Sequence, residues 1–342
     1  MMPLKRAVLG ALAGPGSRLL TQPFRRGVGT IFMLHRFSDP DTGVVAHDPG
    51  QLRTTLAFLR RRGYELVSLG EMFRRLKDPG AQADLGVAFT LDDGYAEQVR
   101  VAGPIFAEFD CPATIFVTAG FLDRTIWFWW DRIEHIFQQS RLGAVQITIG
   151  GKAVSYQWQG GEGRAQACGD FVSRCKLVPN DEKLAAIVRL AQSAEVALPD
   201  QAPAKYAPMS WAELRAWEGR GMSFGPHTVT HPVLKRVGDA QSRQEIAGSW
   251  DRLRAEARSP VPVFCYPNGQ VGDFGAREIA TLNELRFEGA VVGTPGYADV
   301  AEVRAGSDQA FAVRRFSCPE DDLVTSKYVS GIERLMHGTG RS

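Results

Sequence analysis

The chain has 342 residues, of which 44% are hydrophobic and 23% charged, an ordinary globular composition that excludes wholesale disorder and fibrous repeats. The 40 basic and 38 acidic residues give a net charge of +2, which provides no broad basic field for binding nucleic acid. The length accommodates one large α/β domain or two smaller ones.

The cysteines and the N-terminus bear on the cellular compartment. The five cysteines are odd in number and include no CxxC pair, so free thiols in a reducing compartment are favoured over a disulfide framework or a cysteine zinc site. Residues 7–13 follow two basic residues and resemble a signal peptide, but Gly14-Pro15-Gly16 interrupts this short apolar stretch. We therefore expect an N-terminal extension over residues 1–27 with a peripheral helix, and a cytoplasmic location, with export as the alternative. No apolar run approaches the roughly 20 residues of a membrane helix.

The first half of the chain alternates predicted strands and helices. A short apolar run predicts a strand at residues 30–34, and Asp48-Pro49 predicts the capped start of a helix that ends at Gly63. Further strands are predicted at residues 64–68, 87–91 and 113–117.

The second half continues this alternation. Ser210-Trp211-Ala212-Glu213 is a capping-box signature that predicts a helix ending near residues 219–221. Strands are then predicted at residues 222–224, 263–266, 290–292 and 311–313, and helices at about 240–258, 277–285 and 325–336.

This alternation predicts parallel βαβ units, arranged either as a barrel or as a doubly wound sheet of about seven strands. Residues 125–208 break the pattern with an aromatic cluster, a glycine-rich stretch and a helical piece near residues 181–194. We interpret them as an insertion into the α/β unit, not as a separate domain. The aromatic run Trp127-Phe128-Trp129-Trp130 is more typical of an anchor between the insertion and the core, or of an interface, than of a platform that stacks on sugars. Trp130 or Asp131 could still reach the active-site cleft.

Two pairs of residues carry the strongest chemical signal. Asp92 and Asp93 directly follow the predicted strand at 87–91, at the sheet edge where active sites of parallel α/β folds collect. His227 and His231 follow the predicted strand at 222–224 and can present two imidazoles to one cation. Either pair alone has an ordinary alternative, a turn or two surface histidines. Together they supply three metal ligands with an open position, and a second carboxylate as base.

A third segment, Phe264 to Gly269, ends a predicted strand in a Pro-Asn-Gly turn. Such a turn can expose the backbone N–H of Tyr266 to a developing oxyanion, although an ordinary exit from a strand has the same pattern.

The three motifs resemble those of polysaccharide deacetylases of the NodB-homology type. Residues 90–94 match the family's Thr-Phe-Asp-Asp-Gly with Leu91 in place of phenylalanine, and residues 227–231 match His-Ser/Thr-x-x-His. Residues 32–37 and 63–69 are similar to the family's first two strands. The resemblance covers about residues 28–125 and 208–318 and implies a distorted (β/α)7-type barrel at 28–318, with the insertion at about 125–208 and a C-terminal helix and tail at 319–342.

The resemblance also implies roles for the motif residues. Asp92 would be the general base, Asp93, His227 and His231 the ligands of one divalent metal ion, and the Tyr266 N–H an oxyanion donor. Zn²⁺ suits this ligand set best, and Co²⁺, Ni²⁺ or Mn²⁺ would also fit.

The chain departs from the family at two positions. Cys265 stands where many members have an arginine that pairs with the catalytic aspartate, and Arg314 or Arg315 could replace it, with Arg315 as our choice. Leu335-Met336-His337 matches the letters of the family's general-acid motif in a terminal helix. His35, at the end of the first strand, is a better-placed pocket residue, with a buried structural histidine as the alternative.

The sequence therefore predicts a metal-dependent N-deacetylase of amino sugars in an oligosaccharide, a polysaccharide or a lipid-linked glycan. The alternatives are a deacylase of a small amide or formylated sugar, and a non-catalytic carbohydrate-binding relative. A role in making a surface polysaccharide follows from the resemblance alone. The expected partner is an N-acetylated glycan, with neither a nucleic acid nor a membrane-spanning segment.

Overall fold

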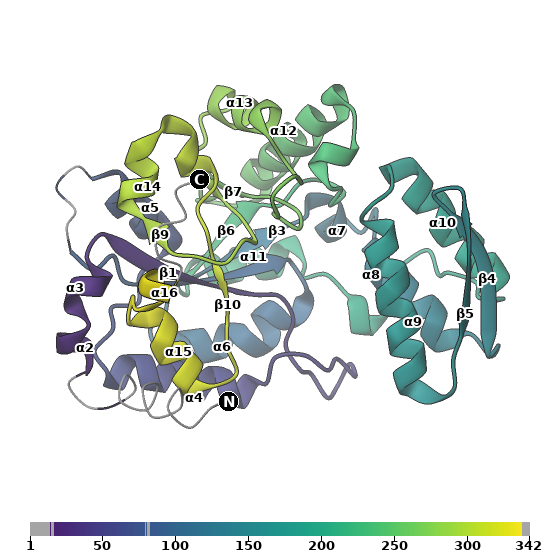
Figure 1. Ribbon diagram of the computed structural model, residues 1–342, viewed down its shortest axis with the longest axis horizontal. Coiled ribbons are helices and arrows are strands. Elements are labelled where there is room, and N and C mark those ends of the chain that lie inside the picture. Colours follow the sequence, from purple (N-terminus) through teal and green to yellow (C-terminus); the bar gives the residue numbers. More distant parts are fainter. Residues whose placement is uncertain (1–13, 15–16, 79, 81–82, 337–342) are drawn as a thin grey trace.

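Parallel strands form the centre of the computed structural model, which describes residues 14, 17–78, 80 and 83–336 (Figure 1). Five of them pair in the order β10-β1-β2-β3-β6, and β9 pairs antiparallel with the start of β1. β7 pairs in parallel with β8. The bounds are β1 Val28–Leu34, β2 Val87–Asp93, β3 Ala113–Val117, β6 Met222–Pro226, β7 Val263–Cys265, β8 Gly289–Val291, β9 Ala298–Asp299 and β10 Phe316–Ser317.

The curved array of strands approaches a barrel, but its ladder is interrupted between β6 and β7. There the backbone N–H of Val261, just before β7, donates to the carbonyl of Phe224 in β6 at 2.7 Å. On the other side of β8, Val291 forms a bridge with Val313, and the chain then leads into β10. The predicted mixed α/β architecture is confirmed, whereas complete closure of a barrel stays a prediction.

Helices surround this array and follow the predicted chain order. They are α2 Ser17–Leu20, α3 Gln22–Arg25, α4 Pro49–Arg61, α5 Leu69–Lys77, α6 Gly103–Glu108, α7 Ala119–Leu122, α11 Trp211–Glu218, α12 Asp239–Glu256, α13 Ala276–Glu284, α14 Val300–Ala305, α15 Asp322–Val329 and α16 Glu333–Met336. Short turns of other helix types are η1 Gln98–Ala102, η2 Ala204–Tyr206, η3 Leu234–Arg236 and η4 Ser307–Phe311. The predicted caps are confirmed, since Asp48 accepts from Gly50 N–H and Ser210 forms a capping box with Glu213.

Three local predictions were wrong. Residues 64–68 form no strand, because only Leu66 bridges to β2 before α5 begins. Residues 311–313 end a 3₁₀ helix and contribute one bridge through Val313. The helix predicted at 325–336 is two helices, separated at Gly331, whose φ of +77° suits glycine. The apolar stretch at residues 7–13 lies outside the described residues.

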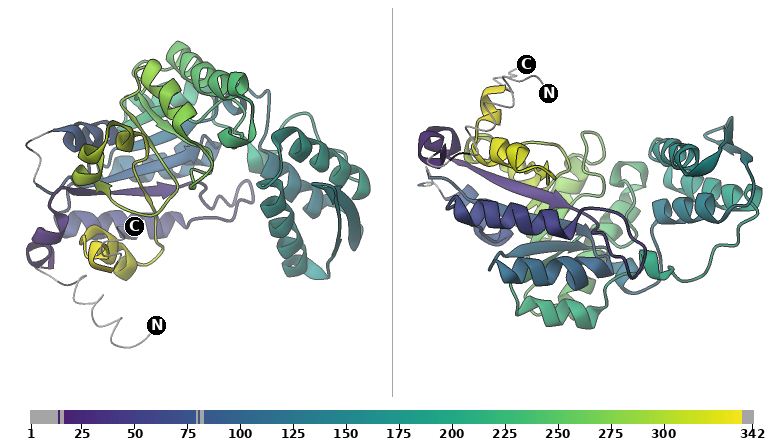
Figure 2. Two further views of the ribbon diagram at one scale, coloured as in Figure 1. Left: turned by 45° about the horizontal axis from the view of Figure 1, so that its top comes forward. Right: turned by 90° about the horizontal axis from the view of Figure 1, so that it is seen from below.

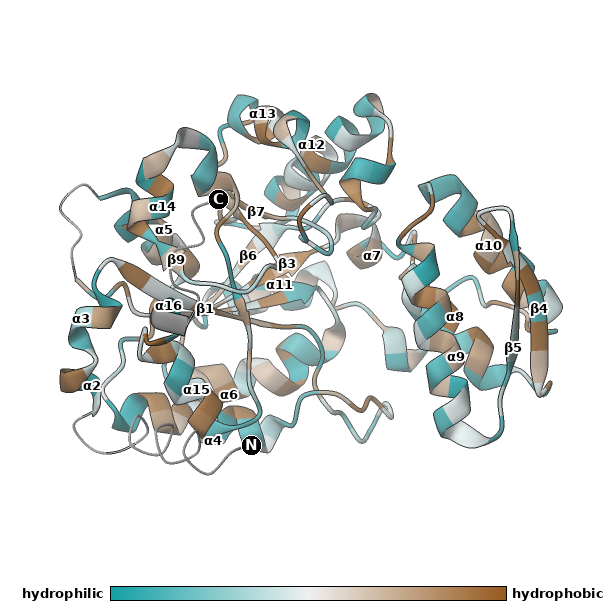
Figure 3. Cartoon of the chain, viewed as in Figure 1, coloured by the Kyte–Doolittle hydropathy of each residue, from teal (hydrophilic) through white to brown (hydrophobic). Residues whose placement is uncertain are grey.

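Residues 129–193 form a lobe beside the strands, which we call the inserted lobe (Figures 1 and 2). It comprises α8 Trp129–Gln139, the hairpin of β4 Ala144–Ile149 and β5 Lys152–Gln157, α9 Gly160–Cys175 and α10 Asn180–Ser193. The lobe buries a hydrophobic cluster of its own, which includes Ile133, Phe137, Phe171 and Ile187. Figure 3 shows hydrophobic residues along β4 as well as along the central strands. Within the described residues, no helix is long and apolar enough to cross a membrane.

Candidate active site

The predicted site residues meet at the carboxyl edge of the parallel strands. Asp92 and Asp93 end β2, the loop 227–231 follows β6, Tyr266 follows β7, and His35 follows β1. A pocket of about 350 Å³ is lined by His35, Asp92, Asp93, His227, His231 and Tyr266, together with Trp129, Trp130, Val172 and Lys176 of the inserted lobe. The convergence of these loops explains why residues far apart in sequence share one cavity.

Asp93, His227 and His231 bring three ligand atoms together. Oδ1 of Asp93 lies 3.7 Å from Nε2 of His227 and 3.5 Å from Nε2 of His231, and the two Nε2 atoms are 3.1 Å apart. Ligands at the zinc–nitrogen distance and the tetrahedral angle are about 3.3 Å apart, so this triangle has the dimensions of a zinc site. All three side chains are buried.

Left-handed backbone at three residues shapes this triangle. Asp93, Thr228 and His231 have φ values of +90°, +65° and +57°, which are unfavourable for side chains other than glycine. The Thr228 hydroxyl accepts from the His231 N–H at 3.0 Å. Glu245 of α12 accepts from the two N–H groups that follow Thr228, both at 2.8 Å, and thereby anchors the histidine loop, residues 227–231.

The protonation of the three groups suits a bound cation. The Cys265 carbonyl accepts from Nδ1 of His227 at 2.7 Å, which leaves the Nε2 lone pair free. Burial lowers the pKa of His227 to about 4 and that of His231 well below its usual value, so both imidazoles are neutral at pH 7. Burial and the neighbouring Asp92 raise the pKa of Asp93. The ionised carboxylate of Asp93 is therefore stabilised by a cation bound beside it. A divalent metal fits this donor set.

Arg315 forms a buried ion pair with Asp92. Its two terminal nitrogens donate to the two carboxylate oxygens at 2.7 and 2.8 Å, and both side chains are buried. Burial alone would raise the pKa of Asp92, but the Arg315 charge outweighs it and holds that pKa well below its usual value. Arg315 also donates to the Thr90 hydroxyl at 3.0 Å and lies 3.2 Å from the Cys265 sulfur. Arg315, just before β10, therefore places its guanidinium beside Cys265, the position where many members of the resembled family have an arginine. Arg314 is instead half-exposed and pairs with Glu302.

The other two predicted residues lie at the same pocket with weaker engagement. Nε2 of His35 is 3.9 Å from Oδ2 of Asp92, and 48% of the His35 side chain is exposed. The backbone N–H of Tyr266 points to the Val291 carbonyl at 3.4 Å, the long limit of a hydrogen bond, so β8 holds it only weakly. The Tyr266 ring stacks on Phe274 with 3.9 Å between ring centres. His337 lies outside the described residues.

A hydrogen-bonded wall of aromatic and acidic groups backs the histidines. The Trp130 ring meets His231 edge to face at 4.7 Å, and its Nε1 donates to the Tyr95 hydroxyl at 3.0 Å. That hydroxyl donates to the Asp131 carboxylate at 2.7 Å, and burial raises the pKa of Asp131 to about 7. Sequence reasoning missed Tyr95, although it adjoins the first motif. It also missed Glu245, for which no local pattern exists.

Comparison with known proteins finds a family match over part of the chain. Residues 182–287 match the family model described as polysaccharide deacetylase, a segment that includes the histidine loop and Tyr266 but not Asp92 or Asp93. Over this segment the chain is similar to polysaccharide deacetylases. The resemblance to polysaccharide deacetylases is confirmed, and so is the prediction of an enzyme that acts on N-acetylated glycans. A sequence search of curated proteins finds no match.

Solved structures support the fold. The Streptococcus pyogenes deacetylase PplD, in complex with acetate, is 17% identical with a TM-score of 0.56, and the match covers 88% of this chain and 98% of PplD. A de-N-acetylase from Aggregatibacter actinomycetemcomitans is 12% identical with a TM-score of 0.53, covering 86% and 96%. IcaB from Ammonifex degensii is 17% identical with a TM-score of 0.51, covering 89% and 97%. The predicted NodB-homology fold class is thereby confirmed.

Proposed function

We propose that this chain is a metal-dependent hydrolase that removes N-acetyl groups from amino sugars of a glycan. The observation that carries the proposal is the triangle of Asp93, His227 and His231 beside the Asp92–Arg315 ion pair, in one pocket. The family match over residues 182–287 supports the reaction class. The solved relatives include proteins described as a deacetylase and a de-N-acetylase, which agrees with this chemistry.

Asp93, His227 and His231 would hold the metal ion, with Zn²⁺ as the best match and Co²⁺, Ni²⁺ or Mn²⁺ as alternatives. A bound divalent ion would polarise the acetyl carbonyl and lower the pKa of the attacking water. His227 is fixed as a ligand because the Cys265 carbonyl holds its Nδ1 proton. Glu245 contributes by holding the histidine loop in its left-handed shape.

Asp92 would take the proton from the attacking water. Arg315 keeps its carboxylate ionised at neutral pH and fixes its orientation through two hydrogen bonds. The C–N bond of the amide then breaks, acetate leaves, and the amine takes a proton. Asp92 can return the proton it accepted. His35, 3.9 Å from Asp92, would donate only in its protonated form, which burial disfavours by lowering the pKa of His35. The Tyr266 N–H, only weakly bound to Val291, would stabilise the oxyanion.

Acetate release from N-acetylglucosamine oligomers tests the proposal. The Zn²⁺-loaded protein should release acetate, and Asp92→Asn should lower the rate about 100- to 10,000-fold, the usual contribution of a general base. Arg314→Gln, next to Arg315 in sequence but outside the pocket, is the control and should keep full activity. Glycan binding without acetate release from any N-acetylated or formylated substrate would contradict the proposal and favour a carbohydrate-binding protein. The glycan, the cytoplasmic location and the biosynthetic role stay predictions.

A further inference from the structure

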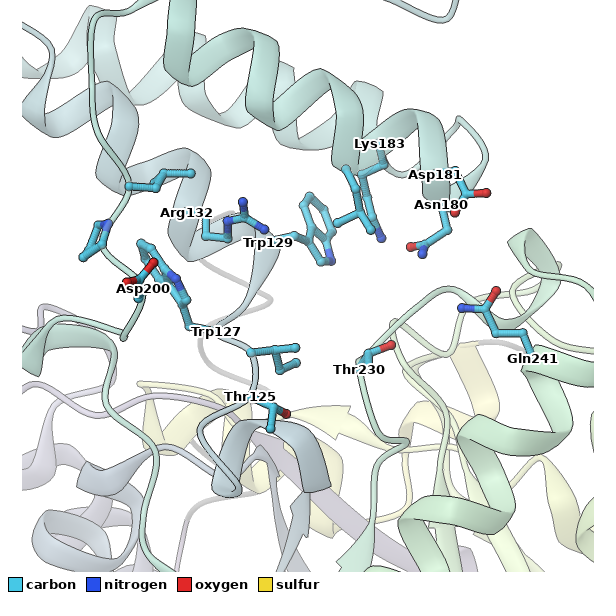
Figure 4. Close-up of a pocket in the computed structure, with 14 residues that line it drawn as sticks. Thr125, Trp127, Trp129, Arg132, Asn180, Asp181, Lys183, Asp200, Thr230 and Gln241 are labelled. Carbon is cyan, nitrogen blue, oxygen red and sulfur yellow. The ribbon is translucent and has the colours of Figure 1, made fainter.

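A second cavity lies between the inserted lobe and the strand-bearing part of the chain, and we call it the lobe cleft (Figure 4). Its volume is about 560 Å³, within the range of pockets that hold small organic ligands. Its walls come from the start of α8, the start of α10, the connection near residue 200, the histidine loop and α12. The cleft is therefore built by both parts of the chain.

Lys183 is a buried cation of this cleft. Its side chain is 4% exposed, and its ammonium lies 4.9 Å from the centre of the Trp129 ring. Among the described residues its ammonium forms neither a hydrogen bond nor an ion pair. Figure 4 shows the side chain reaching from α10 into the space between the two parts. Burial lowers the pKa of Lys183 to about 8, so the Lys183 side chain is still mostly charged at pH 7. An ammonium on so buried a residue is unfavourable without a counter-charge, and Glu245, whose charge raises the pKa of Lys183, forms no ion pair with it in the described part of the chain.

Arg132 is a second unpaired cation in the same cleft. It lies one helical turn after Trp129 on α8 and is half-buried. Its Nε is buried without a hydrogen-bond partner, and burial is the sole cause that lowers its pKa. Asp181 and Asp200 also line the cleft, but both are exposed, and within the described part of the chain neither pairs with Arg132 or Lys183.

The lobe cleft adjoins the pocket of the candidate active site. Trp129 lines both cavities, and Thr230, which lines the cleft, directly precedes the ligand residue His231. The two cavities therefore share Trp129 as a common wall, and a glycan bound at the histidines would have the cleft beside it. A charged group next to the acetamido group on a bound glycan would then meet the two unpaired cations.

We propose that the lobe cleft binds an anionic group of the glycan, a carboxylate or a phosphate, through Lys183 and Arg132. The substrate would accordingly be an acidic glycan in which the anionic group lies close to the N-acetylated residue. This inference rests on the proposed function, and it adds the substrate class.

Binding of two matched oligosaccharides and a phosphorylated oligomer tests the proposal, measured by calorimetry in the Asp92→Asn background so that turnover is suppressed. The first is an oligosaccharide that alternates N-acetylglucosamine with glucuronic acid. The second is the same oligosaccharide with its carboxyl groups reduced to hydroxymethyl groups. The third is an N-acetylglucosamine oligomer that ends in a phosphate monoester. We expect at least one anionic ligand to bind about tenfold more tightly than the reduced one. This difference in affinity should shrink at high salt. The anionic ligand that binds more tightly shows whether the cleft prefers a carboxylate or a phosphate.

Single substitutions locate the contact. Lys183→Met and Arg132→Gln should each weaken the anionic ligand about tenfold and leave the reduced ligand unchanged. Lys152→Met and Arg141→Gln remove the same charges at exposed positions of the lobe away from the cleft, and should bind all ligands normally. Lys183→Arg keeps the charge and should retain the preference. Arg132 is half-buried, so its variant serves if Lys183→Met does not fold.

The outcomes separate this proposal from the proposed function. Equal binding of the anionic and reduced ligands, or a preference that survives both Lys183→Met and Arg132→Gln, would overturn the proposal. Acetate release by the unsubstituted protein without an anionic preference would overturn the cleft assignment alone. Loss of the preference in both variants supports the cleft even if no acetate is released, in which case only the proposed reaction fails.

Discussion

Replacement of Arg315 by methionine tests how the chain keeps Asp92 ionised. The guanidinium donates to both oxygens of Asp92 and is 1% exposed, so its removal leaves a buried carboxylate without a counter-ion. Breaking a buried ion pair on one side usually costs about 3–5 kcal/mol of folding free energy. The pKa of Asp92 should then rise above its usual value, because burial is the largest opposing effect and Arg315 is what lowers that pKa.

The pH dependence has a defined sign. In the unsubstituted protein the lowered pKa of Asp92 stabilises the fold above about pH 4, and this stability is lost as the pH falls. In Arg315→Met the raised pKa reverses the sign, so stability is lost as the pH rises above about 4. The difference in unfolding free energy between the two proteins should therefore grow from acid to neutral pH.

Urea unfolding at several pH values and kcat/KM against pH measure both effects. At pH 7 we expect Arg315→Met to lose about 100- to 10,000-fold in kcat/KM, with partial recovery at higher pH as Asp92 ionises. Arg314→Met, which removes an exposed arginine, should change the unfolding free energy by less than about 0.5 kcal/mol. The double variant Asp92→Asn/Arg315→Met should regain part of the lost stability. Unchanged stability and an unchanged pH profile in Arg315→Met would refute the reasoning.

Three further perturbations test the loop, the wall and the strands. Glu245→Gln removes the charge that anchors the histidine loop, so Zn²⁺ affinity in chelator competition should fall about 10- to 100-fold, and normal affinity would show that the loop holds itself. Because the pKa of Asp131 is raised to about 7, the folded state binds a proton there that the unfolded chain releases above about pH 4. The stability of the unsubstituted protein should accordingly decline more between pH 5 and 8 than that of Asp131→Asn, and parallel unfolding curves would contradict this. Gly225→Ala places a Cβ 2.8 Å from the Phe116 ring and 2.9 Å from the Val263 carbonyl, so it should destabilise by about 1–3 kcal/mol, and a normal Tm would disprove this close packing.

The sequence predicted those site and capping residues whose positions depend on the residues next to them in the chain. Asp92, Asp93, His227 and His231 each follow an apolar run, and the carboxyl ends of parallel strands share one edge of a sheet. The capped starts of α4 and α11 were predicted for the same reason, since the capping residues act within one turn. Arg315 was one of two neighbours that could reach the site, and only the strand register decides between them.

Contacts between distant segments account for what was missed. Glu245 lies on α12 and meets the histidine loop only because the helix packs beside it, and Tyr95 meets Asp131 through the inserted lobe. Residues 64–68 have the composition of a strand, yet they meet only the start of β2 and form a single bridge. The lobe cleft depends on how two parts of the chain face each other, which no periodicity in the sequence encodes.

Metal content tests the central claim most directly. The purified protein, reconstituted with Zn²⁺ and dialysed, should retain about one ion per chain by elemental analysis. Asp93→Ala and His227→Ala should each lose it, whereas His135→Ala, a histidine of the inserted lobe outside the pocket, should retain it. An absence of bound Zn²⁺, Co²⁺ or Ni²⁺ in the unsubstituted protein, or full retention in Asp93→Ala and His227→Ala, would contradict the account of this site.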